Sequence, residues 1–240
     1  MKTNEREQAI LEILRDRQFA SVRFLAANLY TSPSSVRRSL TRMQNAGLVR
    51  RNYGGVILCD NEKRTAAPDV RMEQHKAQKK EIAARASELL RSGMTVFLDA
   101  STTCAYMVEH IAQIPDVTVF TNNLRTAAEL VERGVDTYCI GGHCSNNAAI
   151  TVGSYAESMI RDIGADIFFF SSQALSDDGV ITDCSPEETA VRRALLANAR
   201  KKVFLCDSSK FGKHSVHRLC TLDEVDECFF DKSFTPVANE

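Results

Sequence analysis

Hydrophobic positions in the first sixty residues recur at the spacing of short helices. The pattern predicts helices over 6–15 and 21–29. A third helix is expected between Ser32, which can cap it, and Gly47, which ends it. Two β-prone arms then flank an Asn-Tyr-Gly-Gly turn, which predicts a hairpin over 48–58. Three helices and a hairpin in this order predict a winged helix-turn-helix.

The third helix has two different faces. Val36, Leu40 and Met43 form an apolar face that we expect to lie inward, and the opposite face carries hydroxyls and arginines. Such a face suits the major groove of DNA, and arginines of the hairpin would lie near phosphates. The residues expected to contact DNA are Ser32, Ser34, Ser35, Arg37, Arg38, Arg42, Arg50, Arg51 and Tyr53. The alternative is a helical subdomain whose arginines only solvate one face.

Beyond a polar segment, the pattern changes to alternating strands and helices. Strand-like runs occur at 95–98, 117–120, 137–140, 166–170 and 202–206, separated by helical stretches near 102–112, 123–133, 152–162 and 187–200. This alternation predicts an α/β domain with a mostly parallel, doubly wound sheet covered on both faces. The expected domains are 1–58 for DNA binding, a linker over 59–75, and a sensor and oligomerisation domain over 76–240.

Polar residues gather where these strands end, which is where ligands of such sheets bind. Small hydroxyl residues beside free backbone N–H groups suit a phosphate, and a lysine adds a positive charge. The expected residues of this site are Asp99, Ser101, Thr102, Thr103, Thr121, Asn122, Asn123, Gly141, Gly142, Asp207 and Lys210. The alternative is that each Ser, Thr or Asn only caps its own helix.

Charge separates the two parts of the chain. The net charge of −1 is the sum of +6 over residues 1–57 and −7 over residues 58–240. A basic head on an acidic body is expected when one part of a protein meets a polyanion. Because 44% of residues are hydrophobic and 25% are charged, composition excludes disordered, collagen-like and coiled-coil chains.

The compartment follows from what the sequence lacks. The first residues form a charged amphipathic stretch without the apolar core of a signal peptide, and no apolar run reaches the roughly 18 residues of a membrane span. The eight cysteines contain no Cys-x-x-Cys spacing, so we expect reduced thiols and neither disulfides nor a metal site. These features predict a cytoplasmic protein without a membrane partner.

The DNA-binding segment resembles the DeoR family of bacterial transcriptional regulators. That family has a Ser-x-x-Thr-Ile-Arg-Arg-Asp-Leu helix, and residues 32–40 read Ser-Pro-Ser-Ser-Val-Arg-Arg-Ser-Leu, with Ser35 and Ser39 replacing Thr and Asp. The Gly-Leu-Val-Arg-Arg-Asn-Tyr-Gly-Gly run over 47–55 is similar to the wing of the family.

The body resembles the sensor domain of the same family. The similarity includes Thr-Asn-Asn at 121–123 and Asp-Ser-Ser-Lys-Phe-Gly at 207–212. It implies a fold related to ribose-5-phosphate isomerase and glucosamine-phosphate deaminase, which binds a phosphorylated sugar and alters DNA affinity. Carried over by position, the resemblance assigns to the effector site Asp99, Thr102, Thr103, Thr121, Asn122, Gly141, Glu188, Asp207 and Lys210.

Departures from the family pattern cluster in this expected pocket. Usual glycines are replaced at Ser101, Ala149, Ser171 and Ala174, and the segment 143–147 lacks an arginine that is often present. Side chains in place of glycine narrow a pocket, and a lost arginine removes a bidentate phosphate partner. We therefore expect a modified effector preference or weakened phosphate binding.

These observations favour a transcriptional repressor of carbohydrate-metabolism genes, with neither enzymatic activity nor a cofactor. Its expected partners are double-stranded operator DNA, a phosphorylated sugar, and further copies of the chain in a homodimer or homotetramer. One alternative is a sugar-phosphate isomerase-like enzyme using Asp99, Glu188 and Lys210 as acid–base groups. Another is a DNA-binding regulator whose second domain only oligomerises.

Overall fold

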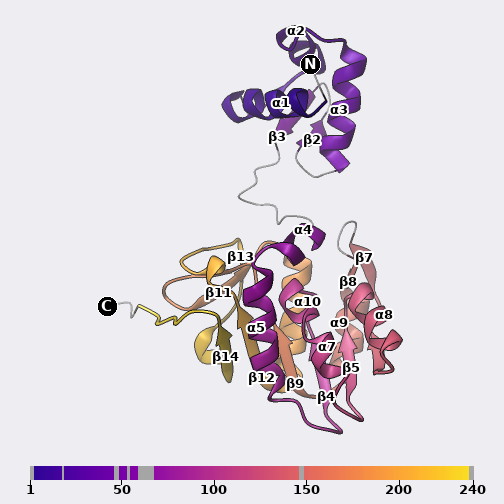
Figure 1. Ribbon diagram of the computed structural model, residues 1–240, viewed down its shortest axis with the longest axis vertical. Coiled ribbons are helices and arrows are strands. Elements are labelled where there is room, and N and C mark those ends of the chain that lie inside the picture. The colour runs from indigo at the N-terminus through magenta and orange to yellow at the C-terminus, as the bar shows by residue number, and fades with distance from the viewer. Residues whose placement is uncertain are drawn as a thin grey trace. The chain divides into compact units, whose positions relative to one another are not determined.

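The computed structural model describes residues 3–17, 19–45, 49–52, 55–58, 68–145 and 149–237. The chain divides into two compact units, Met1–Thr65 and Ala66–Glu240 (Figure 1). Among the helices described, none combines the length and the apolar character needed to cross a bilayer.

The described residues of unit 1 form three helices and a small antiparallel sheet of order β1-β3-β2. Val36, Leu40 and Met43 are buried together with Ile10, Leu14 and Leu25, so the inward face predicted for the third helix is confirmed. The short strand β1 was not predicted. The elements are α1 (Thr3–Arg17), β1 (Phe19–Ala20), α2 (Val22–Asn28), α3 (Pro33–Asn45), β2 (Val49–Asn52) and β3 (Gly55–Leu58).

The turn between α2 and α3 is built on an unusual residue. Thr31 N donates to Ala26 O, and Tyr30 N donates to Ala27 O, which is the pattern of a Schellman motif. The motif places Tyr30 in the left-handed region at φ 47°, where glycine or asparagine is usual. The Tyr30 side chain is 98% exposed, so packing does not compensate for the backbone strain.

Unit 2 is centred on a six-stranded sheet of order β14-β12-β9-β4-β5-β6, in which every neighbouring pair is parallel. An antiparallel sheet of order β10-β11-β13 and the hairpin β7-β8 lie outside it. The elements are α4 (Pro68–Glu73), α5 (Lys76–Ser87), β4 (Thr95–Leu98), α6 (Thr102–Ala105), α7 (Val108–Ile111), β5 (Thr118–Thr121), α8 (Leu124–Glu132), β6 (Asp136–Cys139), β7 (His143–Ser145), β8 (Ile150–Val152), α9 (Ser154–Arg161), β9 (Ala165–Phe170), β10 (Ala174–Leu175), β11 (Val180–Asp183), α10 (Pro186–Ala197), β12 (Ala199–Cys206), η1 (Ser208–Lys210), β13 (His217–Thr221), η2 (Leu222–Glu224) and β14 (Glu227–Phe230).

Both faces of the parallel sheet are covered, as expected for strands without polar alternation. Ile167 and Phe169 of β9 pack in one core with α5 and α7, whereas Phe168 and Phe170 pack in the other with α9 and α10 (Figure 1). The predicted fold class, a winged helix-turn-helix followed by a doubly wound α/β domain, is confirmed.

Aromatic rings connect all six strands on one face of this sheet. Tyr138 of β6 stacks on Phe120 of β5, whose ring meets Phe97 of β4 edge-on at 6.1 Å. Phe97 in turn contacts Phe168 of β9. The series continues through Phe170 of β9, Phe204 of β12 and Phe230 of β14. We call this row the aromatic seam.

The segment predicted as a linker over 59–75 contains a helix. α4 occupies 68–73 and lies in unit 2, whereas residues 59–67 lie outside the described part of the chain. Pro68 at the start of α4 is compatible with a helix because a first-turn residue needs no N–H donor. The domain boundaries given above stay predictions.

Candidate functional site

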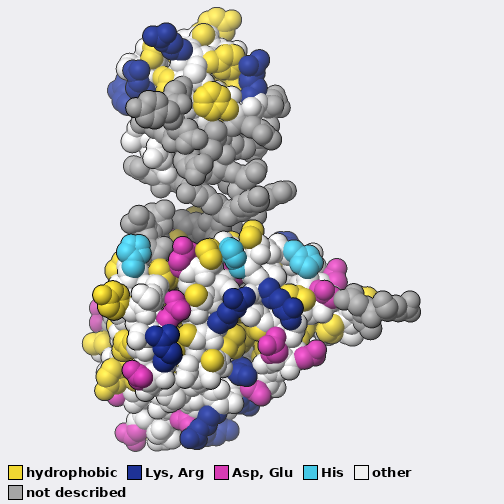
Figure 2. All heavy atoms as spheres, turned by 180° about the vertical axis from the view of Figure 1, so that it is seen from behind, with side chains coloured by type: hydrophobic (Ala, Val, Ile, Leu, Met, Phe, Trp, Pro, Cys, Tyr) yellow, Lys and Arg dark blue, Asp and Glu magenta, His cyan; other side chains and the backbone are white. Residues whose placement is uncertain are grey.

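The residues expected to contact DNA from α3 lie mainly on its exposed side. Ser32 caps the helix, its Oγ accepting from Ser35 N at 3.2 Å, and it also forms a hydrogen bond with Ser34 Oγ at 2.9 Å. Arg37 and Arg38 are exposed one turn further along. Figure 2 shows Lys and Arg side chains at the surface of unit 1.

Arg42, which we also expected at the DNA, is engaged within unit 1. Its Nε donates to Glu7 Oε1 of α1 at 2.9 Å, and its Nη2 donates to Ser39 Oγ at 3.2 Å. Ser39 is buried, so the residue that replaces the family's aspartate helps to hold Arg42. In this structure Arg42 joins α3 to α1.

For the arginines expected on the wing, the structure describes the backbone and not the side chains. Arg50 and Arg51 fall on β2, and Tyr53 lies outside the described residues. Gly55 opens β3 next to β1. A Cβ on Gly55 would lie 2.4 Å from the Phe19 ring and 2.6 Å from Ala20 O, so the three-stranded sheet requires glycine there.

In unit 2 the expected site residues lie at the carboxyl ends of the parallel strands. Asp99 follows β4 and is 1% exposed; its Oδ2 accepts from Ser171 N, after β9, at 3.2 Å. Asn123, after β5, donates through Nδ2 to Ala100 O at 3.2 Å. The structure therefore brings the ends of three strands together.

A buried arginine that the sequence analysis did not select organises this edge. Arg192 of α10 donates through Nε to Asp99 Oδ1 at 2.8 Å, through Nη1 to Asp183 Oδ2 at 2.6 Å and through Nη2 to Glu188 Oε2 at 3.3 Å. Burial lowers the pKa of Arg192, but the three carboxylates outweigh burial and leave it above its ordinary value. Burial also raises the pKa of Asp183, and the positive charge of Arg192 opposes this rise. Glu188 and Arg192 are four residues apart on one predicted helix, a spacing that would have signalled the pair.

Two lysines lie at the same edge. Lys210 Nζ donates to Ser171 Oγ at 2.8 Å and lies 3.8 Å from Asp207 Oδ2. Lys79 of α5 is buried, and its Nζ donates to Thr102 Oγ1 at 3.2 Å and to the carbonyl of Arg71. Burial, together with repulsion from Lys210, lowers the pKa of Lys79 to about 8. Lys79 gave no signal in the sequence, because a lysine on an amphipathic helix usually faces water.

Several buried polar atoms at this edge lack a hydrogen-bond partner among the described residues. They are Thr103 Oγ1 on α6, Asn122 Oδ1 after β5 and Asp207 Oδ2 after β12, the last with only the Lys210 ion pair. Buried polar atoms are usually hydrogen-bonded, and exceptions often mark functional positions. Ligand hydroxyls can donate to Asn122 Oδ1 and Asp207 Oδ2, which only accept, whereas Thr103 Oγ1 can either donate or accept.

A cavity of about 90 Å³ adjoins these strand ends. Ser101, Thr102 and Asn123 of the expected site line it, together with Arg71 of α4 and Arg125 of α8. The other expected residues are not among its lining residues; they are Asp99, Thr103, Thr121, Asn122, Gly141, Gly142, Glu188, Asp207 and Lys210. Gly142 instead permits close packing, because a Cβ there would lie 2.7 Å from Val152 O.

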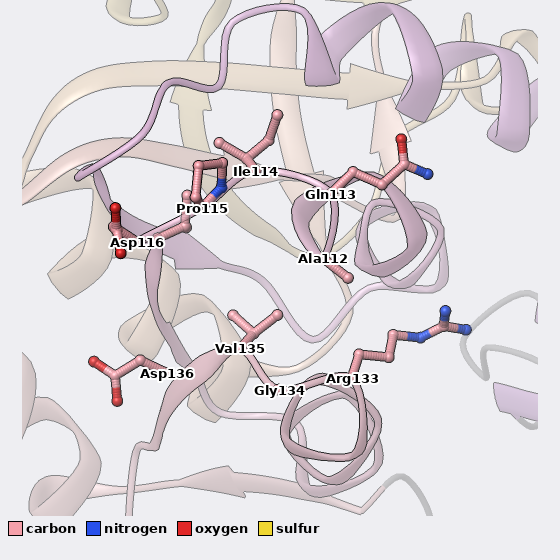
Figure 3. A pocket seen from close by; sticks show the side chains of 10 residues that line it. Ala112, Gln113, Ile114, Pro115, Asp116, Arg133, Gly134, Val135 and Asp136 are labelled. Carbon is pink, nitrogen blue, oxygen red and sulfur yellow. The ribbon is translucent and has the colours of Figure 1, made fainter.

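The larger hollow in Figure 3 lies at the opposite edge of the sheet. It measures about 400 Å³ and is lined by residues 112–117 and 133–136. Its charged groups do not converge: Arg133 pairs with Glu129 at 3.0 Å, Asp136 accepts from Thr118 at 2.9 Å, and the Arg133 side chain extends away from Asp116 (Figure 3). Despite its size, it has no residue of the expected site.

Comparison with known proteins adds independent information. A sequence model described as the DeoR C terminal sensor domain matches residues 74–232, and one described as a DeoR-like helix-turn-helix domain matches residues 6–62. The chain is 29% identical to the HTH-type transcriptional regulator GlpR of Haloferax volcanii, over 92% of this chain and 87% of that protein. It is 25% identical to the glycerol-3-phosphate regulon repressor of Escherichia coli, over 96% and 92%.

Among solved structures, the eIF2B delta subunit of Chaetomium thermophilum superposes with a TM-score of 0.50. The similarity covers 68% of this chain and 58% of that one at 14% identity. It concerns the fold alone.

Proposed function

The chain belongs to the DeoR family of transcriptional regulators, and from this we propose that unit 1 binds operator DNA through α3 while unit 2 binds a phosphorylated sugar that alters the affinity for DNA. The observation that carries the effector part is that Lys79 and Lys210 lie at the same sheet edge as Thr103 Oγ1 and Asn122 Oδ1, two buried atoms without a hydrogen-bond partner among the described residues. Regulation requires that the sugar bind two conformations of the chain with different affinities.

The proposed DNA contacts are the exposed α3 residues Ser34, Arg37 and Arg38, with Arg50 and Arg51 of β2. Arginine contacts to phosphates release counterions, so the dissociation constant for a duplex is expected to rise steeply with salt concentration. Arg37→Ala should weaken binding by about 1–3 kcal/mol if Arg37 reads a base. Fluorescence anisotropy with duplexes selected by the chain from a random pool measures both, with Arg161→Ala of α9 as control. A flat salt response would contradict the proposed interface.

The proposed effector site comprises Asp99, Ser101, Thr102, Thr103, Thr121, Asn122, Asn123, Glu188, Asp207 and Lys210, extended by Lys79 and Arg71. A phosphate would be attracted by the lysines, and sugar hydroxyls could bind Asn122 Oδ1 and Thr103 Oγ1. The name of the glycerol-3-phosphate regulon repressor is consistent with a phosphorylated polyol.

Calorimetric titration with glycerol 3-phosphate, ribose 5-phosphate, glucose 6-phosphate and their unphosphorylated forms tests the effector site. Binding that requires the phosphate and weakens in Lys210→Gln is expected. Absence of binding across the panel would favour a domain that only oligomerises. Turnover of ribose 5-phosphate would favour the isomerase-like alternative.

We also propose that the chain represses carbohydrate-metabolism genes in the cytoplasm as a homodimer or homotetramer. A helix-turn-helix reads one half-site, and paired half-sites require two copies. Light scattering of the full chain, with and without duplex DNA, measures the number of copies.

A further inference from the structure

α4 is attached to the rest of unit 2 by side chains from three separate elements. Lys79 of α5 donates to the Arg71 carbonyl, and Tyr106 Oη, at the end of α6, donates to the Met72 carbonyl at 2.7 Å. Arg125 of α8 pairs with the Asp69 carboxylate. The last carbonyls of a helix have no partner within it, so Lys79 and Tyr106 satisfy groups that would otherwise lack one.

The same helix supplies a cation to the candidate effector site. Arg71 lines the cavity beside Ser101 and Thr102. Burial lowers the pKa of the Arg71 guanidinium, and the charge of Glu188 opposes this effect. Arg71 therefore lies within electrostatic reach of the Arg192 network although α4 belongs to a segment that the sequence pattern assigns to a linker.

One side chain connects the ligand edge to α4 directly. Lys79 donates both to Thr102 Oγ1, a proposed ligand contact, and to the Arg71 carbonyl. An anion near Thr102 would give the ammonium a third acceptor and would attract the Arg71 guanidinium at the same time. Both effects depend on where α4 lies. The effector site therefore has one affinity for the anion when α4 is docked and another when it is undocked.

We propose that α4 is the element through which occupancy of the effector site changes DNA affinity: an anionic ligand contacts Arg71 and Lys79 and holds α4 in its docked position. The inference rests on the proposed effector site. In the sequence, α4 begins at Pro68, and unit 1 ends at Thr65. A change in the docking of α4 is therefore transmitted where the chain leaves the DNA-binding unit.

The first test needs no effector. In the full chain, Tyr106→Phe combined with Asp69→Asn removes two of the three α4 contacts while leaving the charges of Lys79 and Arg71 in place. If docking of α4 and DNA binding are coupled, the dissociation constant for the selected duplex should change by at least about fivefold, because coupling of 1–3 kcal/mol corresponds to about 5–150-fold. Tyr155→Phe on α9, whose side chain is 82% exposed, is the matched control. A dissociation constant equal to that of wild type in a folded variant overturns the coupling.

The second test uses ribose 5-phosphate and inorganic phosphate as probes. We expect either probe to slow hydrogen exchange over 68–73 in wild type, and Arg71→Gln to weaken phosphate binding about tenfold. Unchanged phosphate affinity in Arg71→Gln overturns the contact with Arg71. If wild type binds neither probe, the proposed effector class is wrong, while the effector-free experiment still decides whether α4 controls DNA affinity.

Discussion

Replacing Arg192 by methionine should destabilise unit 2 strongly. The substitution keeps a long side chain but leaves the carboxylates of Asp99, Asp183 and Glu188 without their shared cation, which donates at 2.6–3.3 Å. Removing one partner of a buried ion pair costs about 3–5 kcal/mol. For a unit of this size, 1 kcal/mol shifts the melting temperature by about 2–4 °C, so we expect a decrease of roughly 6–20 °C.

The pH dependence of this loss separates charge from packing. Without Arg192, the pKa values of the buried carboxylates rise above their unfolded values near 4, so the penalty begins above the unfolded values and is complete only above the raised folded values. As the pH falls toward 4, these groups take up protons in the folded state and the penalty shrinks. The difference in melting temperature between wild type and Arg192→Met should therefore be larger at pH 7.5 than at pH 5.

Thermal unfolding followed by circular dichroism at both pH values measures this difference. Arg193→Met is the control, because Arg193 is exposed on the same helix and should change the melting temperature little. An equal loss at pH 5 and pH 7.5 would refute the electrostatic account and leave packing as the cause. A loss no larger than that of Arg193→Met would refute both.

Three further substitutions test other parts of the structure. Because the pKa of Lys79 is about 8, the affinity for a phosphate ester should fall as the pH rises through 8. Above pH 8, binding of the ester should be accompanied by proton uptake at Lys79. Calorimetry between pH 7 and 9.5 should show this fall in affinity in wild type and not in Lys79→Met. Tyr30→Gly should remove about 1 kcal/mol of strain from the left-handed backbone and raise the melting temperature of unit 1 by about 4–8 °C. Tyr155→Gly in α9 should instead lower stability. If both substitutions changed stability in the same direction, the strain argument would be contradicted. Ser171→Ala releases the Lys210 donor and should raise phosphate affinity about twofold to tenfold, whereas a decrease would mean that the Ser171 hydroxyl itself contacts the ligand.

Elements with a sustained hydrophobic period were predictable from the sequence. The run at 95–98 coincides with β4, and the expected helix at 123–133 appears as α8. β10 and β7 were missed because strands of two or three residues show no periodicity. α4 was missed because it has only six residues and its last carbonyls are bound by Lys79 and Tyr106, side chains of other elements 8 and 34 positions further along the chain.

The candidate site was predictable only at the strand ends. Asp99 and Asn123 follow runs whose termini the pattern locates. The pairing of Arg192 with Asp99 joins residues 93 positions apart, which no local pattern reveals. The pairing of Arg42 with Glu7 likewise depends on how α1 and α3 pack, so no local pattern reveals it; because the Arg42 side chain is still 50% exposed, its contact with DNA stays a prediction.

The aromatic seam has a consequence for how unit 2 can change shape. Each ring contact across neighbouring strands contributes about 0.5–1.5 kcal/mol beyond burial, and the contacts run without interruption from Tyr138 in β6 to Phe230 in β14. An inner strand cannot slide without breaking ring contacts on both sides, and an edge strand cannot slide without breaking one, so the six strands should open as one cooperative foldon in native-state hydrogen exchange. Local fluctuations are then left to the peripheral helices and hairpins, and the sheet acts as the fixed frame against which they move.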